Sequence, residues 1–287
     1  MERILLCGNE RISELRSGSS SKGDQPKWRS GDTWYKADHM GYEGAAEVVV
    51  STLLEKSNVP NFVKYRPVQI QSEDRLFTGC ASPNFRGADE MLVTFERLHR
   101  SYTGRSLAME LGQIFPAEDK IRYVVQFVEE KTGLTGVGAY LTLLLEVDAF
   151  FLNEDRHTNN LEVIRNEESR KFSFCPVFDN GLALLADTQV DYPLDGEIYQ
   201  MIARVKGKPF KEDFLEQMEA AEALYGAQLR FTFTKDDVET ALSKVRPYYG
   251  DSICQRIQTV IFEQMRKYQI LTFNAHKSSC DLHIIML

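Results

Sequence analysis

The chain has 287 residues, of which 43% are hydrophobic and 26% are charged, and its net charge is −8 with an isoelectric point near 5.3. This length and mixture are typical of a globular protein with one large domain or two lobes, and they allow a core without disulfides or a structural metal. The acidic balance argues against a broad basic surface, so we expect no direct nucleic-acid binding. A small local site for a nucleotide is compatible with this charge.

The five cysteines are scattered, and they form neither a C-x-x-C motif nor a zinc-finger spacing with histidine. They are typical of reduced thiols, which favours a cytoplasmic protein. The apolar run at residues 4–7 is too short for a signal peptide, and no run approaches the roughly 20 apolar residues of a membrane span. We therefore expect no stable membrane association. Export by a route that needs no signal peptide remains an alternative, and the oligomeric state stays open.

The first third of the chain is rich in predicted strands and contains one clear helix. Residues 16–23, Arg-Ser-Gly-Ser-Ser-Ser-Lys-Gly, are typical of a turn or loop. The aromatic stretch Thr33–Ala37 then predicts a strand, and apolar residues at helical spacing predict a helix over 43–56. Further strands are predicted over 61–65 and 91–95. We assign residues 1–97 to a small, mixed N-lobe.

From about Leu107 onward, the pattern becomes mainly helical. Two short strands interrupt it, over 161–164 and 172–175. Long apolar stripes predict helices over 118–131, 137–152, 210–224, 235–244 and 252–271. The predicted fold class is α+β, with the two lobes of a protein-kinase-like fold and residues 98–287 in the larger helical C-lobe.

Three polar residues around the two short strands indicate phosphoryl-transfer chemistry. Asp155 and Asn160 lie in the segment between the long apolar helix and the first strand, and Asp179 follows the second strand in the sequence Phe-Asp-Asn-Gly. Phosphoryl transfer needs a carboxylate to orient the attacking hydroxyl and oxygen ligands to hold Mg²⁺. A β-hairpin returns its end beside its start, so we expect the three side chains to lie together. Each alone would be an ordinary turn residue, but the joint pattern predicts a catalytic centre.

A kinase also needs a strand lysine that is paired with a helical glutamate and holds the phosphates of ATP. Lys36 lies near the end of the aromatic strand, and the next helix carries Glu43 and Glu47. Glu47 lies one turn inside the helix and is the preferred partner, whereas Glu43 at the helix start is the alternative.

The serine-rich loop is the candidate phosphate-binding loop. Ser19, Ser20, Ser21 and Lys22 lie in it, and backbone amides of small residues can hold phosphate oxygens. The loop lacks the final Gly-Lys-[Ser/Thr] of a Walker A motif and the G-x-G-x-x-G of protein kinases. A flexible linker is the alternative, and only the kinase-like residues downstream favour phosphate binding.

The motif Asp155-x-His157-x-x-Asn160 resembles the catalytic loop of the HipA-like serine/threonine kinases and of the phosphatidylinositol 3/4-kinase-like families. The sequence Phe-Asp-Asn-Gly at 178–181 resembles their metal-binding turn. Ser-Lys-Gly-Asp-Gln-Pro-Lys at 21–27 is similar to the HipA phosphate-loop motif, and 95–100 resembles the segment that joins the two lobes. The likeness is greatest to the compact, CtkA-type bacterial kinases and covers residues from about 15 to 200.

The resemblance implies a bacterial serine/threonine protein kinase that uses ATP and Mg²⁺. It implies that Asp155 is the catalytic base, with His157 in the same loop, and that Asn160 and Asp179 bind the metal. Lys36 would hold the phosphates of ATP. Glu96 or Leu98 would contact adenine through the backbone, and autophosphorylation would occur on a serine of the phosphate loop.

Two other functions remain open from the sequence. A phosphoinositide kinase would share the Asp-Arg-His motif, although the segment 187–197 is acidic and does not suit an anionic lipid headgroup. A pseudokinase that binds nucleotide without transfer would have no need for Asp155, Asn160 and Asp179 together. We therefore expect a protein substrate.

Overall fold

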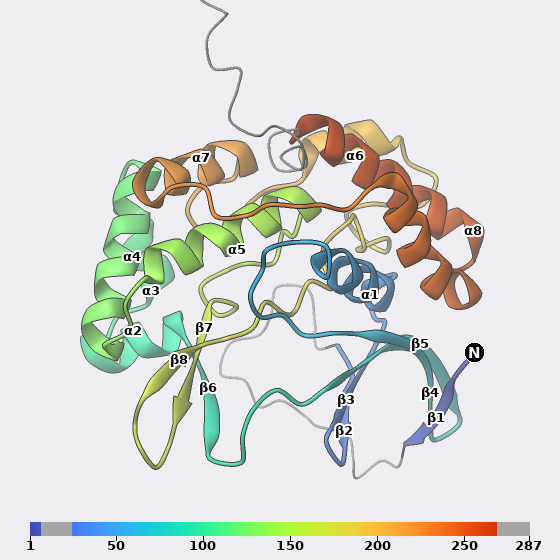
Figure 1. Ribbon diagram of the computed structural model, residues 1–287, viewed down its shortest axis with the longest axis horizontal. Helices are drawn as coiled ribbons and strands as arrows, with labels where there is room; N and C mark the ends of the chain where they lie inside the picture. Colours follow the sequence, from blue (N-terminus) through green and yellow to red (C-terminus); the bar gives the residue numbers. More distant parts are fainter. Residues whose placement is uncertain (7–24, 269–287) are drawn as a thin grey trace, which may run out of the picture.

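The computed structural model describes residues 1–6 and 25–268, and it has an α+β fold with a curled sheet on one side and helices on the other (Figure 1). The first sheet has five strands in the order β1-β4-β5-β3-β2, and only β1 and β4 pair in parallel. Its strands are β1 (Arg3–Leu6), β2 (Lys27–Ser30), β3 (Thr33–Ala37), β4 (Arg66–Ser72) and β5 (Arg75–Pro83). Helix α1 (Glu43–Leu54) packs against β3, β4 and β5.

The rest of the described chain forms a small antiparallel sheet and a group of helices. The three strands of this sheet lie in the order β6-β7-β8 and are β6 (Glu90–Thr94), β7 (Glu162–Asn166) and β8 (Phe172–Phe174). The helices are α2 (Phe95–Thr103), α3 (Leu107–Leu111), α4 (Ala117–Thr132), α5 (Val137–Phe151), α6 (Ile198–Arg204), α7 (Phe214–Tyr225) and α8 (Lys235–Lys267). The predicted boundary after residue 97 falls inside α2.

Helix α5 forms the centre of the helical side and positions the candidate site. It is apolar around nearly its whole circumference, as expected for a helix with neighbours on all sides, and only Ala139 and Tyr140 are not fully buried. It packs against α4, α7 and α8. Its buried charged residues, Glu146 and Asp148, therefore need partners inside the protein.

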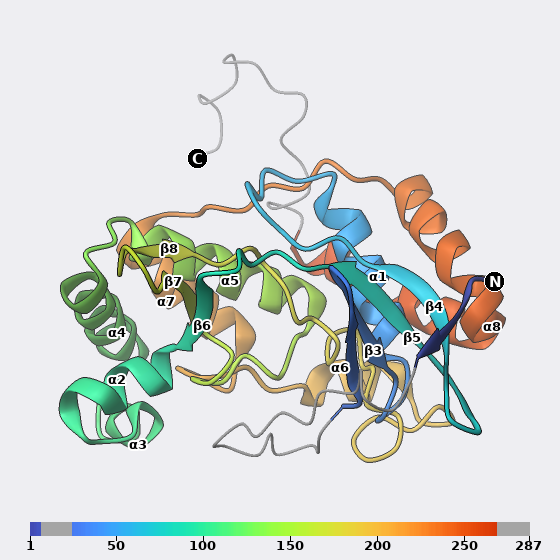
Figure 2. The same cartoon turned by 90° about the horizontal axis from the view of Figure 1, so that it is seen from below.

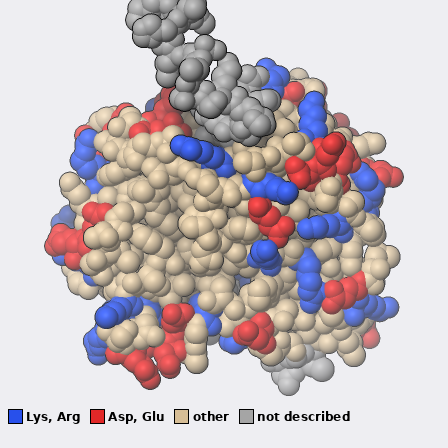
Figure 3. Space-filling model, in the orientation of Figure 1, with Lys and Arg blue, Asp and Glu red and all other residues tan. Residues whose placement is uncertain are grey.

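Helix α8, the last helix within the described residues, returns to the first sheet. It packs against α1 and β4 as well as against α5 and α6, as the two views show (Figures 1 and 2). On the face seen in Figure 3, lysine and arginine side chains are interspersed with acidic ones, mainly toward one side and the lower edge. No helix in residues 1–6 or 25–268 combines the length and the apolar character that crossing a membrane requires.

The structure confirms the predicted fold class and corrects several predicted elements. Residues 61–65 form no strand, because their only ladder contact is a single bridge between Phe62 and Val177. The helix predicted to begin at 210 begins at Phe214, after a loop. The last two predicted helices both fall on α8, and the backbone between them leaves helical geometry at Gly250, in agreement with the prediction of two segments. The predictions did not include β1, β2, β4, β5, α2, α3 and α6.

Candidate active site

Lys36 links the sheet, helix α1 and the turn that carries Asp179. Its Nζ lies 2.6 Å from Oε1 of Glu47 and 2.6 Å from Oδ1 of Asp179, and its side chain is 11% exposed. Burial alone would lower the pKa of Lys36, but Asp179 and Glu47 outweigh it and raise the pKa well above its usual value. Lys36 is therefore a charged amine at the meeting point of three elements.

Glu47, and not Glu43, is the glutamate that contacts Lys36. The second carboxylate oxygen of Glu47 accepts a hydrogen bond from the backbone N–H of Asn180 at 2.9 Å, so this one side chain holds both the lysine and the turn that carries Asp179. The carboxylate of Glu43 instead accepts bonds from the backbone N–H groups of residues 39–41, in the loop before α1.

Asp155 and Asn160 are joined directly in the candidate catalytic loop. The amide nitrogen Nδ2 of Asn160 donates to the backbone oxygen of Asp155 at 2.8 Å and to its carboxylate Oδ2 at 3.0 Å. Two backbone bonds tighten the loop, from His157 N to Asp155 O and from Asn160 N to His157 O, each 2.8 Å long. Because the amide nitrogen is engaged, the amide oxygen of Asn160 is the atom that can ligate a cation.

His157 lies beside the candidate base. Its Nε2 is 3.6 Å from Oδ1 of Asp155, and its side chain is one quarter exposed. Burial lowers the pKa of His157, and the positive charges of Lys208 and Arg156 act in the same direction, against the carboxylates of Asp155 and Asp179. The net direction favours a neutral imidazole next to Asp155.

Arg156 is a residue of the candidate site that the sequence did not indicate. Its guanidinium donates through NH1 to the backbone oxygen of Asn160 at 3.2 Å and to that of Phe178 at 3.4 Å. Its NH2 group donates to Oδ1 of Asn180 at 3.4 Å. One side chain thus bonds both the loop of Asp155 and Asn160 and the turn of Asp179.

The opposite side of this guanidinium is bonded to helix α5. Nε and NH2 of Arg156 donate to the two carboxylate oxygens of Asp148 at 2.9 and 3.1 Å, and Asn153 donates to the same carboxylate at 2.8 Å. A sequence signal for this pair existed, since Asp148 is an acidic residue in an otherwise apolar stripe. Such a residue indicates that a residue of opposite charge is buried beside it. The spacing alone does not show which residue that is.

Glu96 and Leu98 lie in helix α2, just beyond strand β6. Leu98 is buried in the core. The buried carboxylate of Glu96 accepts bonds from the hydroxyl of Thr158 at 3.0 Å and from the backbone N–H of Ala108 at 3.1 Å. The Glu96 side chain therefore fixes the candidate catalytic loop against α3, while an adenine contact through the backbone of Glu96 or Leu98 stays a prediction.

The residues present fit the magnesium ion that the resemblance implies. Asn160 offers an amide oxygen and Asp179 a partly exposed carboxylate, and these hard oxygen donors suit Mg²⁺ beside phosphate and water. Asp179 has a φ of 61°, a left-handed conformation that is uncommon outside glycine and typical of constrained functional turns. The candidate phosphate-loop residues, Ser19, Ser20, Ser21 and Lys22, lie outside the described residues.

A second acidic group lies beside the catalytic loop. Glu154, Asp187 and Asp191 each offer a carboxylate oxygen, and these oxygens lie within 4.8 Å of one another. Glu154 also accepts a hydrogen bond from the hydroxyl of Tyr192 at 2.7 Å. The carboxylates could hold a divalent cation, but acidic clusters of this kind are common without one.

Comparison with known proteins identifies the type of fold to which this site belongs. No model of a known protein family matches the chain, and no curated protein sequence matches it. Among solved structures, the crystal structure of the proinflammatory kinase CtkA of Helicobacter pylori is similar over 92% of this chain and 95% of that chain, with a TM-score of 0.58 and 15% sequence identity. The chain has a kinase-like fold. At this identity the likeness is one of fold, and the roles of individual residues depend on their own geometry.

Proposed function

We propose that the protein is an ATP- and Mg²⁺-dependent kinase of the HipA-like type, which phosphorylates serine or threonine on protein. The observation that carries the proposal is that two side chains, Lys36 and Arg156, connect the turn of Asp179 to other parts of the site. Lys36 contacts Asp179 and Glu47 together, and Arg156 bonds the adjoining turn and the loop of Asn160. A base, two oxygen ligands and a phosphate-binding amine are thereby gathered into one place.

Each residue supplies one requirement of phosphoryl transfer. Asp155 orients the acceptor hydroxyl and takes its proton as the new oxygen–phosphorus bond forms. Lys36, kept charged by its two carboxylates, offsets the negative charge of the nucleotide phosphates. Asn160 and Asp179 would hold Mg²⁺, which when bound neutralises charge on the phosphates.

A protein acceptor is favoured over a lipid one by the segment that follows the metal-binding turn. Residues 187–197 contain no lysine or arginine, and their charged members are Asp187, Asp191, Asp195 and Glu197. Recognition of an anionic lipid headgroup uses basic side chains, which this segment does not supply. The fold similarity to a solved bacterial kinase supports the wider assignment to kinases.

The test is transfer of labelled phosphate from ATP in the presence of Mg²⁺, with the protein itself, casein and phosphatidylinositol vesicles as acceptors. We expect label on serine or threonine for the wild type, and a rate about 10²- to 10⁴-fold lower for Asp155→Ala. Mapping of the label tests autophosphorylation at Ser19, Ser20 or Ser21.

Thermal unfolding of each variant is the control for folding. Label on phosphatidylinositol alone would identify a lipid kinase. Saturable binding of ATP without transfer to any acceptor would identify a pseudokinase. Equal rates for the wild type and Asp155→Ala would exclude Asp155 as the base.

A further inference from the structure

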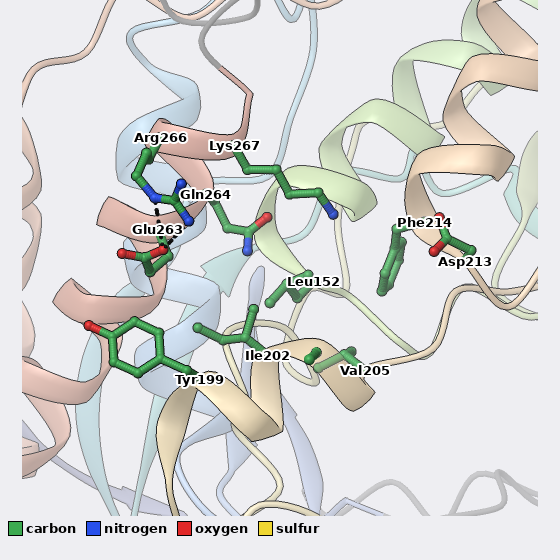
Figure 4. Close-up of a pocket in the computed structure, with 11 residues that line it drawn as sticks. Leu152, Tyr199, Ile202, Val205, Asp213, Phe214, Glu263, Gln264, Arg266 and Lys267 are labelled. Carbon is green, nitrogen blue, oxygen red and sulfur yellow. Dashed lines mark hydrogen bonds and ion pairs between the residues drawn. The ribbon is translucent and has the colours of Figure 1, made fainter.

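A cavity of about 310 Å³ lies on the helical side of the protein, where four helices meet. Gln264 lines it from α8, and Leu152 lines it at the end of α5 (Figure 4). Ile202 of α6 and Phe214, the first residue of α7, line it as well. Of the candidate catalytic, metal-binding and nucleotide-binding residues that the structure describes, none is in its wall. The cavity is therefore separate from the candidate active site.

Gln264 presents a buried amide to this cavity. The residue is 1% exposed, and its side-chain oxygen Oε1 accepts no hydrogen bond from any residue in the ranges 1–6 and 25–268. The amide points away from α8 toward Leu152 (Figure 4). Buried amide oxygens in folded proteins are nearly always hydrogen-bonded, because an unpaired one loses its bond to water without replacement. The oxygen of Gln264 therefore indicates a donor that comes from outside the chain.

The charged residues in the wall are already engaged with other groups of the protein. Arg266 donates to one carboxylate oxygen of Glu263 at 2.9 and 3.1 Å. Asp213 is the N-cap of α7 and accepts a backbone N–H of that helix at 3.0 Å. The ammonium of Lys267 lies over the ring of Tyr268, 5.1 Å from the ring centre. Because these charges have partners, the arrangement favours a neutral ligand over an ion.

The rest of the wall and the size of the cavity suit a small ring system. The other lining residues are Leu152, Tyr199, Ile202, Ala203, Val205 and Phe214, which are mainly apolar. An apolar cavity of about 150 Å³ holds one benzene molecule, so a cavity of about twice that volume has room for a bicyclic ring.

From these observations we infer that the cavity is a second ligand-binding site, which takes a small, neutral, mostly apolar ring compound with one N–H or O–H group. The ring packs against the apolar side chains of α5, α6 and α7, and its burial provides most of the affinity. The N–H or O–H group donates to Oε1 of Gln264 and so selects this class of compound over purely apolar ones.

Indole and 1-methylindole are matched probes for this site, because they share one bicyclic ring and only indole carries an N–H donor. We expect indole to bind the full chain with a Kd on the order of 0.1–1 mM, in keeping with the affinity per atom of small ligands. We expect 1-methylindole to bind about tenfold more weakly, which is the effect of one lost hydrogen bond. Calorimetric titration measures both affinities.

Three variants connect the binding to the cavity. Gln264→Met keeps the length of the side chain without its oxygen, so it should bind both probes equally, about as the wild type binds 1-methylindole. Gln255→Met, a change of an exposed glutamine on the same helix, is the matched control and should keep the preference for indole. Ile202→Trp fills the cavity and should abolish binding of both probes.

A wild type that binds neither probe up to the limit of their solubility overturns the inference, and the cavity then holds water alone. Equal affinities of the wild type for the two probes overturn it, as does an unchanged preference for indole in Gln264→Met, since the amide would then not be the group that recognises the donor. Binding that survives in Ile202→Trp also overturns it, because the probes would then bind elsewhere. The wild type and Ile202→Trp decide the outcome if thermal unfolding shows that Gln264→Met does not fold.

Discussion

Arg156 and Asp148 form an ion pair that is almost completely removed from solvent, with side chains 3% and 0% exposed. Burial raises the pKa of Asp148, and Arg156 opposes that rise. Removal of two charges from water is costly, and their attraction offsets this only when the geometry is good and the remaining donors are satisfied. Here the remaining donors of the guanidinium bond both candidate catalytic segments. The pair therefore connects the stability of α5 with the alignment of the candidate metal ligands.

Arg156→Met should lower the free energy of unfolding by about 3–5 kcal/mol, because it leaves the carboxylate of Asp148 buried without its counter-charge. Combination with Asp148→Asn should recover most of this loss. It should not restore the Mg²⁺ concentration needed for half-maximal transfer, because methionine cannot donate to the carbonyls of Asn160 and Phe178. Urea unfolding and Mg²⁺ titration of both variants separate the two effects. A double variant with normal Mg²⁺ dependence would show that Arg156 has a structural role alone.

Helix α8 contains a kink, and the part of α8 beyond the kink contacts helix α1. Its backbone leaves helical geometry at Gly250, where φ is 77° and ψ is 177°, shortly after Pro247. Beyond the kink, Arg256 donates to the hydroxyl of Tyr42 at 3.1 Å and to the backbone oxygen of Tyr192 at 2.8 Å. Tyr42 is the N-cap of α1, the helix that carries Glu47, so Arg256 of α8 contacts both α1 and the segment after the turn of Asp179.

Gly250→Ala should destabilise the protein by about 1–3 kcal/mol, because this φ and ψ combination is essentially restricted to glycine. No atom lies within 4 Å of a Cβ at this position, so the loss would reflect backbone strain and not a clash. Gly87→Ala is the control, since the atoms nearest to a Cβ there belong to the flexible side chain of Glu90, at 3.4 Å or more. Equal unfolding midpoints for the two variants would show that α8 tolerates a different kink.

The stability of the whole molecule should depend on pH through Glu146. Glu146 is fully buried on α5 and accepts backbone hydrogen bonds from Gln228 at 2.9 Å and Leu229 at 2.8 Å. Burial, together with a hydrogen bond to the carboxyl of Glu222, raises the pKa of Glu146 to about 8. A carboxyl with a raised pKa binds its proton more tightly in the folded state. Its contribution to stability is therefore present at low pH and is lost as the pH rises through about 8.

Glu222→Gln should reduce this loss, because it removes the neighbouring negative charge and leaves an amide that can donate to ionised Glu146. Between about pH 6 and pH 9 the free energy of unfolding should fall less for Glu222→Gln than for the wild type. Glu219→Gln, an exposed change on the same helix, should follow the wild type. Urea unfolding across this range measures the difference. Parallel curves for all three proteins would contradict the role of the Glu146–Glu222 pair.

The sequence predicted elements well where periodicity was local and uninterrupted. Strand β3 matches its predicted range, α4 is longer than predicted by one residue at each end, and α5 is shorter by one residue at its C-terminal end. Strands β4 and β5 were not predicted, and each contains a residue that weakens a strand pattern, Pro67 and Gly79. Gly79 is required by packing, because a Cβ there would lie 2.0 Å from the backbone oxygen of Lys36. That requirement comes from the neighbouring strand and cannot be read from the local sequence.

By itself, the sequence determined the candidate chemistry, because the spacing of Asp155, Asn160 and Asp179 around a short hairpin is a local property. Only the tertiary structure decided the partners. Lys36 and Asp179 are 143 positions apart, and the choice of Glu47 over Glu43 depends on how α1 is rotated against the sheet. Arg156 gains its contacts in the same way, from carbonyls on two separate loops that lie together in the folded structure. Hydrogen bonds between distant segments follow from packing, and a one-dimensional pattern does not encode packing directly.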